Sequence, residues 1–184
     1  MIYKIVIILV FYFLAACNNP VKVPGENQKY FETKKYFLNE AAMLQLKNAA
    51  IVKTFIKNDS TETIRSEKVD WKTELLPFLQ INLHKPALVN SFSIDTITEA
   101  NKTLIQYVAK DSTLELRDLK IYLSEAKVDS LFGVMKSSNL YYNAVDTIAY
   151  FGNGNYRISV WNKPRIGKEV RFVLVGSSNL GNTD

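Results

Sequence analysis

The stretch from Leu88 to Val175 consists of short strand-like runs separated by turn residues, and this pattern constrains the fold most. Several of the turns are only a few residues long and are rich in Asn, Asp, Ser, Gly or Pro. Parallel strands need crossovers of a dozen or more residues, so these short turns predict antiparallel pairing. The predicted strands are Leu88–Thr98, Thr103–Lys110, Leu114–Leu123, Val128–Ser137, Leu140–Phe151, Tyr156–Asn162 and Lys168–Val175.

The alternation of side chains within these runs predicts that the sheet has one apolar face. Tyr156, Ile158 and Val160 share one face of their strand, because successive side chains of a strand point to opposite faces. An apolar face needs a covering layer, and helices are the available cover. The alternation slips near Arg117–Asp118, which predicts a β-bulge.

The pattern from Phe31 to Ala49 is helical. Phe37, Ala41, Leu44 and Asn48 follow one stripe of the helix, and the stretch contains no Gly or Pro. Leu38, Ala42 and Gln45 flank that stripe.

Two shorter elements follow the helix. Ile51–Lys57 and Thr61–Arg65 are rich in β-branched residues and predict a β-hairpin. Asp70 is placed to cap a short helix, which Pro77 should kink or end. The residues that this helix should bury are Trp71, Leu75, Phe78 and Leu79.

These elements together predict an α+β fold. We expect a curved antiparallel β-meander of about six to seven strands. The N-terminal helix and the second short helix should cover one face, and the β-hairpin is an addition. Residues 30–184 suit a single domain, and the chain shows no internal repeat.

The first residues, 1–16, predict a secretory signal peptide. Lys4 supplies a positive charge, and the apolar run from Ile5 to Ala16 follows it. Twelve residues reach only about 18 Å as a helix, whereas a bilayer core is roughly 30 Å thick. A permanent transmembrane anchor is therefore disfavoured.

Leu14, Ala15, Ala16 and Cys17 resemble the lipobox of bacterial lipoproteins at every position. The resemblance implies that the Cys17 thiol receives a diacylglyceryl group and that a signal peptidase, recognising Leu14, Ala15 and Ala16, cleaves just before it. The new amine is then acylated, and several acyl chains on one residue give stable membrane anchoring. The alternative is an ordinary signal peptide whose first mature residue happens to be cysteine.

Residues 17–29 read as a flexible tether between the lipidated cysteine and the domain. Pro20, Pro24 and Gly25 lie in this polar stretch, which lets the folded part stand away from the membrane. Lipoproteins of the Bacteroidota often reach the cell surface when acidic residues closely follow the cysteine. Here the first acid is Glu26, so the resemblance favours an outer-membrane anchor facing the periplasm.

Charge and cysteine content limit the partners and the sources of stability. Removal of residues 1–16 leaves 22 basic and 18 acidic residues, a net charge of +4, with both signs interspersed. We therefore expect no nucleic-acid partner and only mild attraction to anionic headgroups. Cys17 is the only cysteine, so no internal disulfide can form and stability must come from an apolar core.

The sequence does not support catalysis. His84 is the only histidine, and a zinc site built around it would need carboxylates alone to complete it. No Gly-x-Ser-x-Gly turn occurs, and Gly152–Asn155 reads as a hairpin turn rather than a phosphate loop. We expect no enzyme activity, no metal site and no cofactor.

A short pattern of Asp, then Ser or Thr, then an apolar residue or Thr recurs more often than composition predicts. It resembles the O-glycosylation sequon of periplasmic proteins in the Bacteroidota, in which the central hydroxyl accepts the glycan. The alternative is β-turn chemistry, because Asp and Ser favour turns and a β-branched residue opens the next strand. The candidate acceptor residues are Ser60, Thr96, Ser112, Ser130 and Thr147.

An aromatic group near the C-terminal end is the best candidate for a binding surface. Neighbouring residues of a strand face opposite ways, so one of each adjacent aromatic pair should face the helices and the other should face outward. Outward rings could contact a protein, a glycan or an acyl chain, whereas packing within the core is the alternative. The members are Tyr141, Tyr142, Tyr150, Phe151, Tyr156 and Trp161.

The whole mature chain is similar to small lipoproteins common in Bacteroidota. Besides the lipobox, the segment from Asp70 to Ala87 and the strand-rich half carry this resemblance, which implies no activity. Two functions remain open. One is a non-catalytic accessory lipoprotein that is membrane-anchored through its acyl chains and binds an envelope protein. The other is a carrier that holds a lipid or another apolar ligand between sheet and helices.

Overall fold

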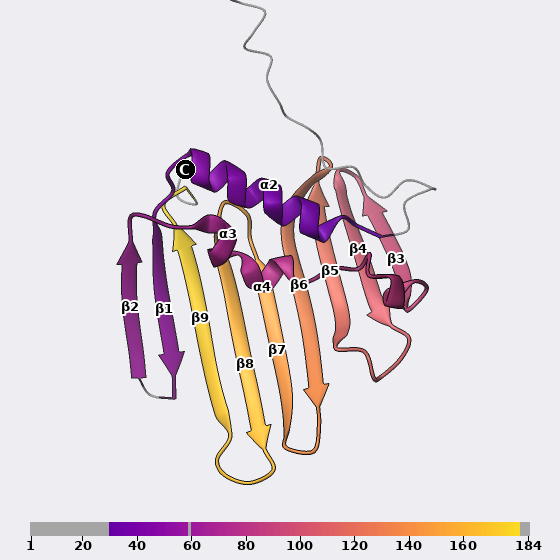
Figure 1. Cartoon of the computed structure of the whole chain (residues 1–184). Helices are drawn as coiled ribbons and strands as arrows, with labels where there is room; N and C mark the ends of the chain where they lie inside the picture. Colours follow the sequence, from indigo (N-terminus) through magenta and orange to yellow (C-terminus); the bar gives the residue numbers. More distant parts are fainter. Residues whose placement is uncertain (1–29, 59, 181–184) are drawn as a thin grey trace, which may run out of the picture.

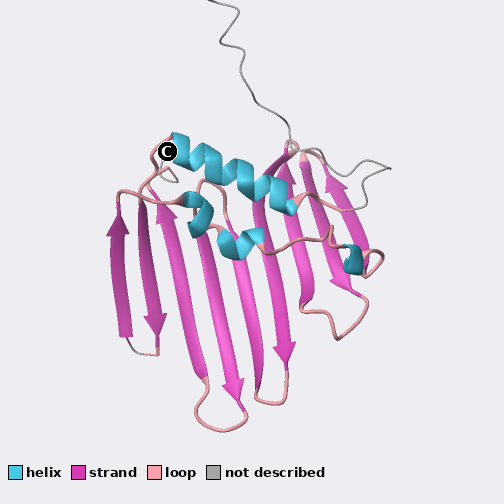
Figure 2. Ribbon diagram, in the orientation of Figure 1, coloured by secondary structure: helices cyan, strands magenta, loops and turns pink. Residues whose placement is uncertain are grey.

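The computed structural model describes residues 30–58 and 60–180, which form one antiparallel sheet with helices on one of its faces (Figures 1 and 2). The predicted signal peptide, Cys17 and the tether lie outside the described residues. The helical elements are α2 (Thr33–Leu46), α3 (Trp71–Glu74), α4 (Leu76–Leu79) and the 3₁₀ helix η2 (Pro86–Leu88). The strands are β1 (Ile51–Lys57), β2 (Ser60–Ser66), β3 (Phe92–Glu99), β4 (Lys102–Ala109), β5 (Leu116–Ser124), β6 (Lys127–Ser138), β7 (Tyr142–Tyr150), β8 (Tyr156–Pro164) and β9 (Val170–Ser178).

The strand order in the sheet is β2-β1-β9-β8-β7-β6-β5-β4-β3. The seven strands from β3 to β9 follow one another as a meander, which confirms the predicted α+β class. The predicted hairpin also forms, but it does not stand apart from the meander. β1 pairs with β9 along its whole length, with Ile51 opposite Ser178, so the sheet has nine strands. The hairpin covers the edge of β9 that would otherwise leave backbone groups unpaired.

The predicted strands differ from the structure by a few residues at their ends, and the largest difference is at the start of β3. Leu88 belongs to the 3₁₀ helix that Pro86 begins, and β3 starts only at Phe92, after Asn90 adopts a left-handed φ of 65°. Likewise β5 starts at Leu116 rather than Leu114. The predicted bulge is confirmed, because the pairing of β5 with β6 shifts between Leu116 and Asp118.

The N-terminal helix is shorter than its sequence pattern. Phe37, Ala41 and Leu44 are buried as predicted, but Asn48 lies beyond the helix with a left-handed φ of 48°. Asparagine adopts this conformation more readily than most residues, and there it ends the helix. The predicted flanking positions, Leu38, Ala42 and Gln45, are exposed.

The second helical segment forms as two short turns. The Asp70 side chain accepts hydrogen bonds from the backbone N–H groups of Lys72 and Thr73, which confirms the predicted cap. The segment then divides into α3 and α4, with Pro77 near the start of α4. Trp71 is fully buried and donates its indole N–H to the carbonyl oxygen of Ala49 at 2.9 Å.

The core lies between the helices and one face of the sheet, called the helix-side face below. In Figure 1 the helices cross the upper part of the sheet, and β7 and β8 continue well below them. Aromatic residues dominate this core. The largest fully buried side chains are Trp71, Tyr107, Tyr150, Tyr156, Phe31, Phe37, Phe78 and Phe92.

Two buried tyrosines join the sheet to the helices. Tyr150 of β7 lies directly opposite Tyr156 of β8. The Tyr150 hydroxyl donates to the carboxylate of Glu40 on α2 at 2.6 Å, and the Tyr156 hydroxyl donates to that of Glu74 on α3. Gly176 of β9 lies opposite Tyr156, and a Cβ atom there would overlap the Tyr156 ring. Glycine at this position therefore makes room for the ring.

Removing these hydroxyls should destabilise the protein unequally. The Tyr150 hydroxyl also accepts the backbone N–H of Gly154 at 3.0 Å, so Tyr150→Phe leaves two groups without this partner. Glu74 keeps a bond from the Lys53 ammonium at 3.0 Å when Tyr156 is changed to Phe. We expect a loss of about 2–3 kcal/mol in unfolding free energy for Tyr150→Phe and roughly 1 kcal/mol for Tyr156→Phe.

Urea denaturation followed by circular dichroism measures both losses. The matched control is Tyr141→Phe, because the Tyr141 side chain is 75% exposed and its hydroxyl should contribute almost nothing. Equal losses for all three variants would contradict the proposed role of the two buried hydroxyls.

Candidate functional site

The face of the sheet opposite the helices, called the outer face below, is a candidate binding surface. No helix among residues 30–58 and 60–180 lies on it (Figure 2). In a sheet with one covered face, the open face ordinarily carries polar side chains. This outer face departs from that rule at the strands β3 to β7.

Three aromatic rings, Tyr122 of β5, Phe132 of β6 and Phe151 just after β7, form the outer aromatic cluster. Tyr122 and Phe132 meet edge to face with ring centroids 5.7 Å apart, and Phe132 meets Phe151 in the same way at 5.7 Å. The three residues are 36%, 38% and 49% exposed, respectively. The rings therefore hold one another in place while remaining open to solvent.

The apolar surface continues from this cluster to the edge of the sheet. Tyr122 lies opposite Leu104 of β4, and Leu104 lies opposite Ile97 of β3. Ile97 is 50% exposed. An unbroken apolar stripe thus crosses the outer face from β3 to the end of β7.

Basic side chains outnumber acidic ones on the strands of the outer face. The Arg171 guanidinium lies over the Trp161 ring at 5.9 Å and pairs with Glu169 at 3.1 Å. The strand register places three acidic residues on this face, Asp95, Glu99 and Asp118. It places more basic residues there, namely Arg65, Lys102, Lys120, Lys127, Lys136, Arg157, Lys163 and Arg171. The outer face therefore carries both apolar and cationic side chains.

The structure does not bring the six predicted aromatic residues together. The prediction is wrong for Tyr150 and Tyr156, which are 0% and 2% exposed and hold the helices through their hydroxyls. Tyr141 is exposed in the turn before β7, and Tyr142 is half-buried on the helix-side face. Trp161 lies on the outer face away from the cluster, whereas Phe151 belongs to the cluster.

Sequence reasoning missed Tyr122 and Phe132, although Phe151 was in the predicted group. Neither Tyr122 nor Phe132 lies in a stretch of the sequence that is unusual in itself. Their meeting depends on the register between β5 and β6, where Tyr122 lies opposite Ser130 and Phe132 opposite Lys120. The signal that could have found them is the outward phase of both strands, once the register is known.

The candidate glycan acceptors are scattered over the fold. Ser60, Thr96, Ser112 and Thr147 are exposed, and Ser130 is half-buried. The Asp111 carboxylate accepts the backbone N–H of Thr113 at 2.8 Å, so turn chemistry accounts for the pattern around Ser112. Glycosylation of the five residues stays a prediction, and Asp59 lies outside the described residues.

His84 lies at the surface beside Glu32. Its Nε2 atom is 3.5 Å from a Glu32 carboxylate oxygen, and its ring meets Tyr30 edge to face at 6.1 Å. Within the described part of the chain, no group of three or more His, Cys, Asp or Glu residues could hold a metal ion.

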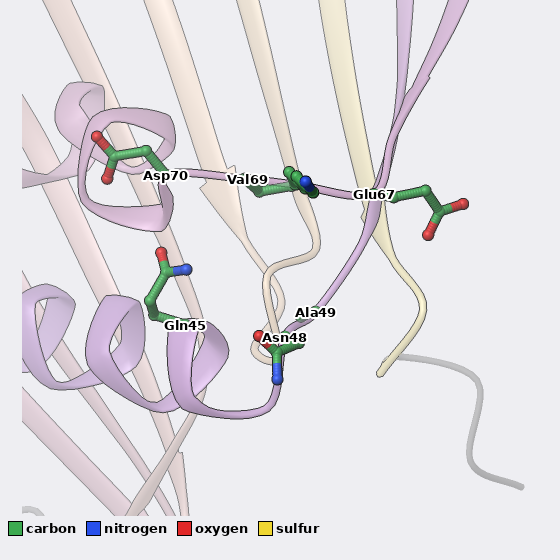
Figure 3. A pocket seen from close by; sticks show the side chains of 7 residues that line it. Gln45, Asn48, Ala49, Glu67, Val69 and Asp70 are labelled. Carbon is green, nitrogen blue, oxygen red and sulfur yellow. The ribbon is translucent and has the colours of Figure 1, made fainter.

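Two of the larger depressions in the surface lie at the edges of the helix layer and the hairpin. One, of about 480 Å³, lies between the end of α2 and the segment before α3. There Gln45 is directed toward the Asp70 segment, whereas Glu67 points away (Figure 3). The other, of about 490 Å³, is lined by Phe55 and Phe172 among others. Neither lies in the space between the sheet and α2, which aromatic side chains fill.

The fold perturbs the pKa of Glu40, whose carboxylate binds the buried Tyr150 hydroxyl. Burial raises its pKa above the ordinary value of 4.5. Hydrogen bonds from the Tyr150 hydroxyl and the Asn153 backbone, together with the Lys47 charge, oppose that rise without cancelling it. Burial also raises the pKa of Tyr150 far above its usual range, so its hydroxyl stays protonated and remains a donor.

No protein-family model matches this sequence, and searches of curated proteins and of solved structures give no match either. No helix among the described residues has both the length and the apolar character needed to cross a bilayer.

Glu40 should make stability depend on pH. Because its pKa is higher in the folded than in the unfolded chain, the folded state binds more protons above pH 4.5. The free energy of unfolding should therefore fall as pH rises from 4.5 through the folded pKa. Glu40→Gln, which cannot ionise, should lose this part of the slope while keeping an acceptor for Tyr150.

Urea denaturation at a series of pH values between 4 and 7 checks this slope. Glu62→Gln, which changes an exposed carboxylate on β2, is the control and should keep the wild-type slope. A wild-type slope in Glu40→Gln would show that another group is responsible.

Proposed function

We propose that this protein is a lipoprotein, anchored through acylated Cys17 and facing the periplasm, that binds an envelope protein through the outer face of its sheet. Its role is non-catalytic. The observation that carries the proposal is the outer aromatic cluster on an uncovered and cationic sheet face.

The chemistry of the outer face supports a protein partner. Interface centres are enriched in aromatic residues and arginine and depleted in acidic residues. The cluster of Tyr122, Phe132 and Phe151 supplies the aromatic centre, and basic side chains surround it. A complementary partner surface would therefore present apolar side chains ringed by carboxylates.

The filled core argues against a carrier that holds its ligand between sheet and helices. Phe37 and Phe78 pack against Tyr150 with ring centroids 5.1 and 5.5 Å away, and Phe78 also meets Tyr156 at 5.7 Å. These rings occupy the space that an apolar ligand would need. Core packing of this kind leaves few voids larger than a water molecule.

The predicted tether is long enough for the outer face to meet a membrane-embedded or peripheral partner. Cys17 and Tyr30 are 13 residues apart. A fully extended chain of that length reaches roughly 45 Å. The anchor therefore restricts the domain to the membrane surface without fixing which side it presents.

Photocrosslinking in living cells tests both parts of the proposal. A benzophenone amino acid placed at Phe132 should give one crosslinked product with an envelope protein, and mass spectrometry identifies that protein. The same amino acid at Tyr141, which is exposed but lies in a turn, should not give this product. Adding Tyr122→Lys and Phe151→Lys should abolish the Phe132 product.

The anchor is measured in the same cells with an alkyne-tagged fatty acid. Wild-type protein should carry the tag and sediment with membranes, whereas Cys17→Ser should lose both. An untagged wild-type protein would refute the anchor. Absence of a Phe132 product, or an identical product at Tyr141, would refute the outer-face interaction.

A further inference from the structure

Strand β3 forms one edge of the sheet, at the end opposite β2 (Figure 1). Within residues 30–58 and 60–180 it pairs with β4 alone, so its other side has no partner strand. Native proteins usually protect such an edge with Lys, Pro or a β-bulge, because it is a template for another strand. β3 has no Lys, Arg, Pro or Gly, its pairing with β4 has no register shift, and its charged residues are Asp95 and Glu99.

The backbone of β3 is directed alternately to β4 and to the open edge. The Lys110 N–H donates to the Ser91 carbonyl oxygen at 2.9 Å, so these two residues are a hydrogen-bonded pair. Such pairs recur at every second residue of an antiparallel ladder, which assigns the odd-numbered residues of β3 to β4. The backbone N–H and C=O groups of Ile94, Thr96 and Thr98 are therefore directed to the open edge.

Isoleucine side chains are exposed on both faces of this edge. Ile94, on the helix-side face, is 38% exposed, and Ile97, on the outer face, is 50% exposed. Ile97 is also the end of the apolar stripe that Tyr122 and Leu104 carry across the outer face. A strand added beside β3 would cover part of both isoleucines and would continue the stripe.

The opposite edge strand, β2, is less suited to pairing. Ile64 is its exposed large apolar residue, and the apolar stripe of the outer face does not extend to it. The neighbouring Arg65 is exposed and pairs with Glu67 at 2.6 Å. A charged side chain on an edge strand protects it from pairing. We therefore expect strand addition at β3 rather than at β2.

The charges of β3 select one register for pairing with a second copy of the chain. In a twofold antiparallel pair, one residue of the strand faces its own copy. Only Asp95 or Thr96 at this centre leaves seven of the eight residues of β3 paired. An Asp95 centre would place two carboxylates directly opposite one another, which is destabilising. A Thr96 centre instead places Asp95 opposite Ile97 of the second copy. It also places Glu99 opposite Ser93, so no like charges face one another.

Two further contacts favour the Thr96 centre. Thr96 would face Thr96 of the second copy, and cross-strand threonine pairs are stabilising. The protein already contains such a pair, because the hydroxyl oxygens of Thr98 and Thr103 are 3.2 Å apart across β3 and β4. The Ile97 side chains of the two copies become diagonal neighbours on the outer face, so the two apolar stripes meet.

We infer that β3 pairs with β3 of a second copy of this chain, antiparallel and centred on Thr96, to give one continuous sheet across a twofold dimer. Both outer faces then lie on the same side of that sheet, and their apolar stripes form a single surface. The pairing requires neither acylated Cys17 nor the proposed envelope partner. It can therefore fail while the proposed function stands.

Disulfide crosslinking of the full chain in isolated envelopes, oxidised with copper phenanthroline, tests the register. Cys17 is the only native cysteine, so the wild type gives the background. Thr96→Cys should give a dimer that a reducing agent separates, because the facing Cα atoms are about 5.5 Å apart, within reach of a disulfide. Thr98→Cys should not, because its copy lies roughly 13 Å further along the strand. Thr63→Cys, at the centre of β2, should also stay monomeric.

Sedimentation of the purified full chain in detergent tests the pairing without a crosslink, and the wild type should sediment as a dimer. Ile97→Asp would place a carboxylate opposite Asp95 of the second copy, whereas Ile97→Lys removes the same apolar side chain but presents an ammonium there. The dimer contains this contact twice, so Ile97→Lys should dimerise about tenfold more tightly than Ile97→Asp. Circular dichroism should show the native fold in both, because the position is half exposed.

Any of four results would overturn the inference. They are a monomeric wild type, the absence of a Thr96→Cys dimer, equally efficient crosslinking of Thr98→Cys or Thr63→Cys, and equal dimer affinity in the two Ile97 variants.

Discussion

The fold depends on one cross-strand pair, Tyr150 and Tyr156, whose hydroxyls bind two carboxylates on two different helices. Each hydroxyl is buried, so each needs its partner, and the partners Glu40 and Glu74 need these donors in turn. The pair therefore fixes where α2 and α3 lie along the strands. A helix layer placed at one end of β7 and β8 cannot also cover their other end.

This placement leaves the sheet with three surfaces of different chemistry. The upper helix-side face is a closed aromatic core, which accounts for stability in a chain without disulfides. The lower helix-side face is apolar with two unsatisfied acceptors. The outer face carries an exposed aromatic cluster among basic side chains. Exposed apolar patches such as this cluster ordinarily mark sites of interaction, and the proposed protein interface follows from it.

Much of the architecture could be predicted because it is local. The Asp70 cap, the break just before Pro77 and the bulge near Asp118 are each encoded in a few neighbouring residues. The surface could not be predicted in the same way. Whether Tyr150 or Phe151 faces inward depends on which strand face the helices cover. The approach of Tyr122 to Phe132 depends on the register between strands, which no local pattern specifies.

Hydroxyl-radical footprinting of the aromatic residues, compared between intact envelopes and purified protein, tests the central claim most directly. In purified protein Tyr122, Phe132 and Phe151 should be oxidised, and Tyr150 and Tyr156 should not. In intact envelopes the first three should become protected, while the exposed Tyr141 stays oxidised in both. Equal oxidation of Phe132 in the two preparations would contradict a bound partner on the outer face.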